Sequence, residues 1–169
     1  MTDPTPIQIV DLPKESRDRA IPILLQSFVG IYRWHAKRTL RDIARVRGAH
    51  VGNELAGISM LDRLTPEVGY VYYLAVGEAF RGRGVGSALL DDAIDLFRTE
   101  GAHILYGAAE EDNAPSLALF RSKGFREVDR KERGYQEGGL GAWGLRSRMM
   151  LVHGEVLLGR FLEAHPSKP

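Results

Sequence analysis

The 169-residue chain contains no cysteine. Disulfide bonds, thiolate metal sites and a cysteine nucleophile are therefore excluded. The five histidines are scattered and lack the short spacing that metal ligands commonly show. No serine stands in a G-x-S-x-G elbow. We therefore expect no metal site and no covalent intermediate on cysteine or on a serine of that kind.

Long apolar runs and a strong charge of one sign are also missing. No segment approaches the ~20 apolar residues of a membrane-spanning helix, and the N-terminal MTDPTPIQIVDL lacks the basic-then-apolar pattern of a signal peptide. A net charge of +1 gives no reason to expect a polyanionic partner. We expect one domain over residues 1–169, located in the cytoplasm, with neither a membrane nor a nucleic acid as partner.

The most informative stretch runs from Tyr70 to Gly86. Its apolar and aromatic residues 71–76 predict a buried strand that ends at Gly77. Glycines and arginines then alternate before an apolar helix, a composition that lets the backbone approach an anion and aim several N–H groups at it. We call this segment the phosphate cradle; its residues are Arg81, Gly82, Arg83, Gly84, Val85 and Gly86.

The spacing within the cradle decides which phosphate site it is similar to. The dinucleotide fingerprint G-x-G-x-x-G is not met, and no Lys follows Gly86 as a P-loop requires. The pattern R-x-x-G-x-G is met by Arg81, Gly84 and Gly86. It resembles the loop with which the GNAT acetyltransferase superfamily binds the pyrophosphate of acetyl-coenzyme A. Taken alone, the segment is equally compatible with a glycine-rich connection carrying two solvated arginines.

A second motif strengthens the resemblance. The segment NAPSLALFRSKGF, residues 113–125, is similar to the family's Asn, short helix and Gly-Phe. The two motifs stand in the family's order and on the expected elements, and the resemblance covers residues 50–130. It implies acetyl-coenzyme A as co-substrate, with a thioester polarised by the backbone N–H of Leu74 and a pantetheine arm paired with Val76. The implied coenzyme-binding residues are Leu74, Ala75, Val76, Arg81, Gly82, Arg83, Gly84, Val85, Gly86, Ser87, Asn113, Ser116 and Phe120.

The catalytic acid and base of many family members are absent from their usual positions. Phe120 stands where a tyrosine commonly protonates the leaving thiolate, and Tyr70 and Ala108 stand where relatives carry a glutamate base. Tyr70 and Tyr72 share a strand face with Leu74 by the period of two. They are candidates to hydrogen-bond the amine or a relay water, and they are equally compatible with packing the acceptor cleft.

Other candidates for contact with the acceptor come from outside the motifs. Trp34 is a further candidate to line the cleft, and the acids most open to a missed role as base are Glu67, Glu110 and Glu111. A cleft without a carboxylate base favours an amine whose pKa lies near neutrality, such as an α-amino group. With no cysteine available, the amine is expected to attack the thioester directly in a ternary complex.

The predicted elements describe an α/β fold with a mixed sheet and helices on both faces. The resemblance makes this a GNAT-like fold with a mostly antiparallel sheet. We expect a strand at 7–12, a helix at 17–29, a second helix that ends at Gly48, a hairpin over 50–64, the strand 71–76, a helix that ends at Gly101, a strand at 103–109, a helix at 113–123, and strands at 125–129 and 146–152. The apolar tail 154–169 is expected to cover a sheet edge or to pack on a second subunit. The second alternative would make the chain a homodimer.

Three functions are compatible with these features. The best supported is an N-acetyltransferase acting on an amine of a small molecule or peptide. The alternative is a catalytically silent protein that binds acetyl-coenzyme A, favoured by Phe120 and the absent base. The weakest is a nucleic-acid-binding domain that uses the basic face of the second helix, because no aromatic stacking platform is evident beside that face.

Overall fold

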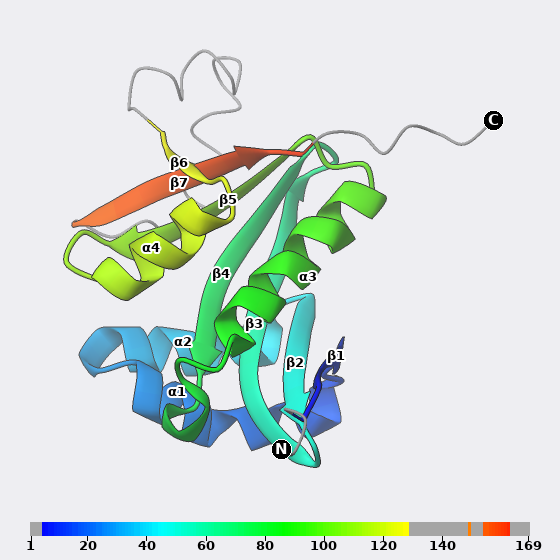
Figure 1. The fold of residues 1–169 in the computed structure, drawn as a ribbon, viewed down its shortest axis with the longest axis vertical. Coiled ribbons are helices and arrows are strands. Elements are labelled where there is room, and N and C mark those ends of the chain that lie inside the picture. Colours follow the sequence, from blue (N-terminus) through cyan, green and yellow to red (C-terminus); the bar gives the residue numbers. More distant parts are fainter. Residues whose placement is uncertain (1–4, 129–148, 150–153, 163–169) are drawn as a thin grey trace. The chain divides into compact units, whose positions relative to one another are not determined.

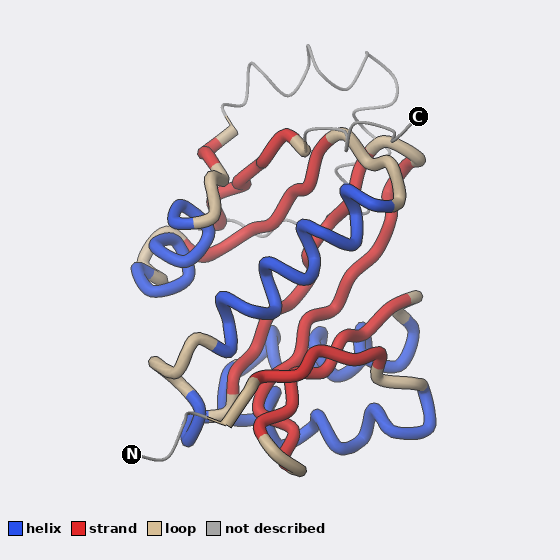
Figure 2. The backbone as a smooth tube through the Cα atoms, turned by 45° about the vertical axis from the view of Figure 1, so that its right-hand side comes forward, coloured by secondary structure: helices blue, strands red, loops and turns tan. Residues whose placement is uncertain are grey.

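The computed structural model describes residues 5–128, 149 and 154–162. Its elements are β1 Ile7–Asp11, the 3-10 helix η1 Lys14–Ala20, α1 Ile21–Ser27, α2 Gly30–Asp42, β2 Arg45–Val51, β3 Glu54–Thr65, β4 Val68–Val76, the 3-10 turn η2 Glu78–Phe80, α3 Val85–Thr99, β5 Ile104–Glu110, α4 Ala114–Ser122, β6 Arg126–Glu127 and β7 Glu155–Phe161. Figures 1 and 2 trace them along the chain.

The strands pair in the order β1-β2-β3-β4-β5-β7-β6. Neighbouring strands are antiparallel at β1–β2, β2–β3, β5–β7 and β6–β7, whereas β4 and β5 run parallel. This confirms the predicted mixed, mostly antiparallel sheet. The chain forms two compact units, the first being Met1–Asp62 with Tyr73–Ala93 and the second Arg63–Tyr72 with Ile94–Pro169.

The predicted second helix is too long. In the first unit α2 ends at Asp42, and residues 45–51 form β2. The buried guanidinium of Arg17 donates to the carbonyl oxygens of Leu40 and Ile43, both at 2.9 Å, and so satisfies acceptors that the end of α2 leaves open. Residues 45–51 then pair with two strands at once, a gain that outweighs helix propensity.

Two basic residues of the predicted second helix lie in a strand instead. Arg45 and Arg47 belong to β2, and Arg47 forms a two-pronged ion pair with Asp92 of α3 at 2.7 and 2.8 Å. These hydrogen bonds to Asp92 raise the pKa of Arg47 above its ordinary value. Arg47 also contacts Asp11 at 2.9 Å. The arginine therefore holds β1, β2 and α3 together in the first unit.

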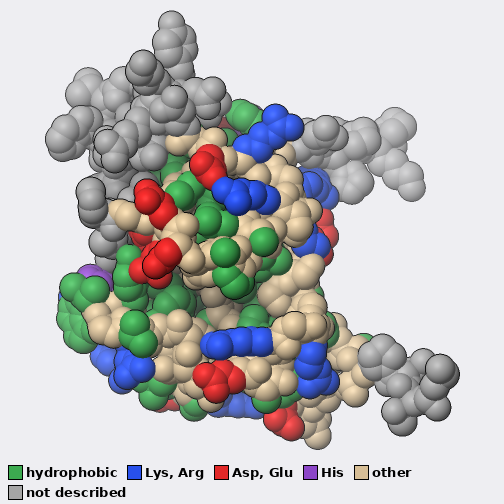
Figure 3. Space-filling model, turned by 60° about the vertical axis from the view of Figure 1, so that its left-hand side comes forward, with side chains coloured by type: hydrophobic (Ala, Val, Ile, Leu, Met, Phe, Trp, Pro, Cys, Tyr) green, Lys and Arg blue, Asp and Glu red, His purple; other side chains and the backbone are tan. Residues whose placement is uncertain are grey.

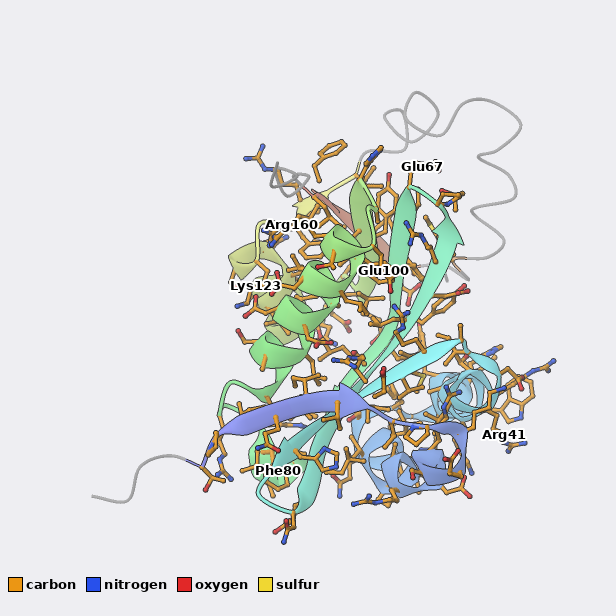
Figure 4. All side chains as sticks on the ribbon, turned by 90° about the vertical axis from the view of Figure 1, so that its right-hand side faces the viewer. Arg41, Glu67, Phe80, Glu100, Lys123 and Arg160 are labelled. Carbon is orange, nitrogen blue, oxygen red and sulfur yellow. The ribbon has the colours of Figure 1, made fainter. Side chains whose placement is uncertain are left out.

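The segment predicted to be an apolar tail that covers a sheet edge or a second subunit is itself a strand of the sheet. In the second unit residues 155–161 form β7, which pairs with β5 along seven residues and with β6 on its other side. Leu157 and Leu158 are 1% and 0% exposed. Arg160 donates to the carbonyl oxygen of Lys123 at the end of α4, at 2.5 Å (Figure 4). The apolar residues of this segment are thus explained by the core of the unit, and the strand predicted at 146–152 lies, except for Met149, outside the described residues.

The remaining predicted elements are confirmed with shifted ends. The hairpin turns at Gly52 and Asn53 between β2 and β3. Pro22 lies in the first turn of α1, where its missing N–H costs nothing. The central strand is longer than predicted, since β4 begins at Val68, but it ends at Val76 as expected. None of the helices in the described part of the chain is long and apolar enough to cross a bilayer.

Candidate functional site

The phosphate cradle lies where the sequence places it, between β4 and α3 in the first unit. Gly77 donates to the carbonyl oxygen of Ala56 at 2.9 Å, which fixes the end of β4 against β3. Gly82 and Gly84 have φ values of +71° and +83°, a left-handed conformation that glycine adopts at little cost. The buried side chain of Val85, 1% exposed, anchors the following helix in the core of the unit.

The first turn of α3 supplies the N–H groups of the cradle. The turn begins with a hydrogen bond from Ala88 N to Gly84 O at 2.9 Å. The N–H groups of Val85, Gly86 and Ser87 precede this bond and have no partner within the helix. The partial positive charge of the helix N-terminus adds to them. The arrangement suits a phosphate group.

The two arginines of the cradle differ in what they contact. Arg81 donates from Nε to Val76 O and from Nη2 to Gln26 O, both at 3.3 Å. It therefore braces the loop against β4 and α1 while it adds positive charge. The guanidinium carbon of Arg83 lies 5.3 Å from the ring centroid of Phe80, a residue labelled in Figure 4.

A residue outside the motif helps to hold the loop. The side-chain oxygen of Gln26, at the end of α1, accepts from the backbone N–H of Glu78 at 3.2 Å. With the Arg81 bond to its carbonyl, Gln26 contacts the loop twice. Sequence reasoning missed it because Gln26 and Glu78 stand far apart in the chain and no local pattern links them.

The last residues of β4 are those to which the resemblance assigns the thioester contact. Leu74 and Val76 are partly buried against a cluster that includes Val85 and Leu89, and Ala75 is 2% exposed. Gly57 of β3 permits this packing, because a Cβ there would lie 2.9 Å from Ala75 O. The backbone of this strand segment is thus held by close contacts within the first unit.

The two tyrosines proposed for catalysis belong to the second unit. Tyr70 is 3% exposed, and its hydroxyl donates to Met149 O at 3.0 Å. Tyr72 is partly buried, with its ring 4.7 Å from that of Tyr70 in an edge-to-face contact. These contacts are those of core residues, so packing explains Tyr70, whereas a contact of Tyr72 with the acceptor stays a prediction.

The second motif builds the start of α4 as predicted. The side-chain oxygen of Asn113 accepts from Ser116 N at 3.2 Å and caps the helix. Phe120 is 5% exposed and contacts the Phe125 ring at 5.0 Å between centroids. A Cβ at Gly107 of β5 would lie 2.6 Å from the Phe120 ring. The position that carries a tyrosine in many relatives is therefore a core position here.

The acids considered as a base belong to the second unit. Glu67 precedes β4, at the end opposite to Leu74, and accepts from Thr65 Oγ1 at 3.0 Å. Glu110 and Glu111 are exposed at the end of β5. The described residues contain no group of three or more His, Asp or Glu side chains that could hold a metal ion.

Trp34 is 57% exposed on α2. Its contact with the acceptor stays a prediction.

Comparison with known proteins gives the family. The acetyltransferase (GNAT) family model matches residues 14–125, more than half of the chain. The N-alpha-acetyltransferase RimI of Mycobacterium tuberculosis is 32% identical over 151 residues, which cover 85% of this chain and 94% of that protein. The mycothiol acetyltransferase of Corynebacterium glutamicum is 31% identical over 74 residues, 44% of this chain and only 25% of that protein.

Solved structures agree on the fold. The ribosomal-protein-S18-alanine N-acetyltransferase of Escherichia coli has a TM-score of 0.70 at 18% identity, covering 97% of this chain and 99% of that one. A GNAT acetyltransferase of Elizabethkingia anophelis with acetyl-CoA bound has a TM-score of 0.64 at 20% identity, covering 95% and 100%.

The chain belongs to the GNAT family of acetyltransferases, as its two motifs predicted. It transfers an acetyl group from acetyl-coenzyme A to an amine.

Proposed function

We propose that the acceptor is the α-amino group at the N-terminus of a polypeptide. The observation that carries this proposal is the extent of similarity to the N-alpha-acetyltransferase RimI, which spans 85% of the chain and nearly all of that relative. Similarity to the mycothiol acetyltransferase spans less than half of the chain. A small-molecule amine is therefore the second candidate.

The lack of a carboxylate at the family's two positions for a base also favours an α-amine. The residues at the family's two positions for a glutamate base are Tyr70 and Ala108, and the Tyr70 hydroxyl is bonded to Met149 O. An α-amino group has a pKa of about 8 and is partly neutral at pH 7, whereas a lysine amine near 10.4 is not. An α-amine thus needs less help from a base than a lysine does.

The reaction we propose is direct attack. The neutral amine nitrogen adds to the thioester carbonyl, the carbon–sulfur bond breaks, and the thiolate of coenzyme A leaves and takes up the proton lost by the amine. The cradle holds the pyrophosphate in the first unit. By the family resemblance, the Leu74 N–H donates to the thioester oxygen, a contact of a kind worth about 10²–10³ in rate. Asn113, Ser116 and Phe120 beside the pantetheine arm stay predictions.

A panel of acceptors tests the proposal. Thiol release from acetyl-coenzyme A is measured with a peptide bearing a free α-amine, the same peptide with a blocked N-terminus and one lysine, and a small-molecule amine. We expect the highest kcat/KM for the first, rising with pH to a limb near 8 that belongs to the amine. A preference for lysine, or a limb near pH 6 to 7, would contradict it. Coenzyme binding without thiol release over the whole panel would favour the catalytically silent alternative.

The cytoplasmic location and the homodimer also stay predictions. The dimer was predicted from an apolar tail, and that segment is β7, an interior strand of the second unit. Light scattering of the whole chain would decide between monomer and dimer.

A further inference from the structure

Exposed apolar side chains concentrate at one corner of the first unit. Six large hydrophobic residues of the described chain are exposed, and four of them lie in the short stretch from α1 to the middle of α2. These four are Leu25 at 40%, Val29 at 75%, Ile31 at 66% and Trp34 at 57%. Single exposed apolar residues need no explanation, but a group of this kind marks an interaction surface.

The same face of α2 is basic. Ile31, Trp34, Arg38 and Arg41 follow one another at intervals of three, four and three residues, which places them on one side of the helix. The guanidinium carbon of Arg38 lies 5.6 Å from the ring centroid of Trp34. Arg41 points away from the helix in Figure 4, and Figure 3 shows hydrophobic and basic side chains side by side on this side of the molecule.

The basic charges of this face are not neutralised within the described chain. Lys37, Arg38 and Arg41 form no ion pair with any described residue, whereas Arg47 of the neighbouring strand has two. Asp42, at the end of the helix, is the single acid of α2. We define the α2 surface as Val29, Ile31, Trp34, Lys37, Arg38 and Arg41.

The start of the α2 surface lies close to the reacting strand. Phe28 precedes Val29, and its ring packs edge-on against Tyr73 of β4 at 5.1 Å between centroids. Tyr73 is the residue before Leu74. A polypeptide whose first residue reaches this part of β4 can therefore continue over the corner and along α2. The helix has 13 residues, about 20 Å, which an extended chain spans with about six residues.

We propose that the α2 surface binds the segment of the acceptor polypeptide that follows the reacting N-terminus, and that this segment is acidic with apolar residues among its acids. This inference rests on the proposed function. Acidic side chains complement the unpaired arginines and lysine, and apolar side chains complement Val29, Ile31 and Trp34. A nucleic acid would use the charges and stack on Trp34 but would leave the exposed aliphatic residues without a partner, and the net charge of +1 gives weak attraction for a polyanion.

The α2 surface also differs from the prediction that no aromatic residue accompanies the basic face of the second helix. An aromatic residue does accompany the basic face, because Trp34 is exposed beside Arg38. RNA is therefore kept as an explicit arm of the test.

The kinetic test uses two peptides of about ten residues with the same first three residues. One continues with Glu, Asp and Leu, and the other has each acid replaced by its amide. We expect KM for the acidic peptide to be about tenfold lower at low salt, with equal kcat, and the difference to shrink as salt rises. The pair Arg38→Glu with Arg41→Glu should abolish the difference, whereas Trp34→Ala should raise KM for both peptides because both carry the leucine. Arg19→Glu, a change at an exposed arginine of η1, is the matched control and should preserve the difference.

A short acceptor separates the surface from the chemistry. With a dipeptide amide, the variants of the α2 surface should keep the kcat/KM of the original chain, because this acceptor does not reach α2. Equal KM for both long peptides, or equal loss with Arg19→Glu, would overturn the proposal while leaving acetyl transfer to α-amines intact.

A binding measurement does not depend on turnover. Trp34 and Trp143 are the two tryptophans of the sequence, and in a Trp143→Phe background the emission reports Trp34 alone. The acidic peptide should shift this emission to the blue as the indole leaves water, and the amide peptide should do so only at about tenfold higher concentration. A shift with no acetylation of any peptide would support the surface and reject the proposed acceptor. Binding of an RNA oligonucleotide in preference to the acidic peptide would overturn it, as would a dimer that Trp34→Ala dissociates in light scattering.

Discussion

Glycines of the cradle in the first unit and glycines of two strands in the second unit serve opposite purposes. In the cradle of the first unit, Gly82 and Gly84 have positive φ, and a Cβ at Gly82 would meet nothing within 4 Å. In the strands of the second unit, Gly107 and Gly159 have ordinary backbone angles but leave room for aromatic rings. A Cβ at Gly107 would lie 2.6 Å from the Phe120 ring, and one at Gly159 would lie 2.8 Å from that of Tyr106.

The two kinds of glycine should differ in whether their replacement affects ligand binding or stability. A cradle glycine is required by backbone conformation and by what approaches it from outside, so its replacement should affect ligand binding before stability. A strand glycine is required by packing inside the unit, so its replacement should affect stability first. The following substitutions test this separation.

The largest loss of stability is expected for Gly107→Ala. The added methyl group collides with the Phe120 ring, which is buried and held by Phe125. Overpacking of this kind costs about 3 kcal/mol, which lowers the melting temperature of a chain of this size by about 6 to 12 °C. Differential scanning calorimetry measures the change. Adding Phe120→Leu should recover at least about 1 kcal/mol because the shorter side chain makes room.

Gly82→Ala is the matched control in the cradle. Its added methyl group meets no atom within 4 Å, so only the positive φ is penalised, by about 1 kcal/mol. A loss of stability as large as that of Gly107→Ala would contradict the proposed difference between the two glycines.

Coenzyme binding should be lost in Gly84→Glu. The carboxylate would project from the exposed cradle and repel the pyrophosphate, so we expect the Kd for acetyl-coenzyme A to rise by about 100-fold or more. The melting temperature should fall only by the few degrees that a positive φ costs. Titration calorimetry measures the affinity, and Gly86→Glu, at a position without positive φ, should weaken binding in the same way. Unchanged affinity in a folded variant would show that the pyrophosphate does not bind at the cradle.

The position and backbone conformation of the cradle could be predicted from the sequence because their determinants are local. The strand residues 71–76, the stop at Gly77 and the glycines all stand within one short stretch, and backbone conformation follows from them directly. The Asn113 cap of α4 was predictable for the same reason. The family followed from the order of the two motifs, and the comparisons confirm it.

Elements set by long-range pairing could not be found in this way. The apolar residues 43, 44 and 46 continue the helical pattern, but residues 45–51 pair with β1 and β3 as a strand. The apolar segment 155–161 predicted contact with a sheet edge or a second subunit, and its place between β5 and β6 could not be found from its own residues. In the site, the burial of Tyr70 and the exposure of Trp34 depend on packing partners that the helix and strand periods do not identify.

A smaller loss of coenzyme affinity than that of Gly84→Glu is expected for Arg81→Ala. The substitution removes one positive charge and the two backbone hydrogen bonds that brace the cradle against β4 and α1. Because Arg81 is exposed, we expect Kd for acetyl-coenzyme A to rise by only about tenfold, and the remaining affinity to vary less with salt. Titration at two ionic strengths measures both. Gln26→Ala, which removes one brace and no charge, should weaken binding without changing the salt dependence.

The smallest effect on stability is expected for Phe120→Tyr. The hydroxyl adds one atom to a ring that already lies against Gly107, and a phenol at a buried position needs a hydrogen-bond partner. We expect the melting temperature to change by no more than about 4 °C and coenzyme affinity to stay within about twofold. Because relatives place their acid here, kcat with a good α-amine should rise, by up to about tenfold. Phe125→Tyr, on the adjacent ring, adds the same atom away from that position and should leave kcat unchanged. An equal kcat for both variants and the original chain would mean that protonation of the thiolate does not limit turnover.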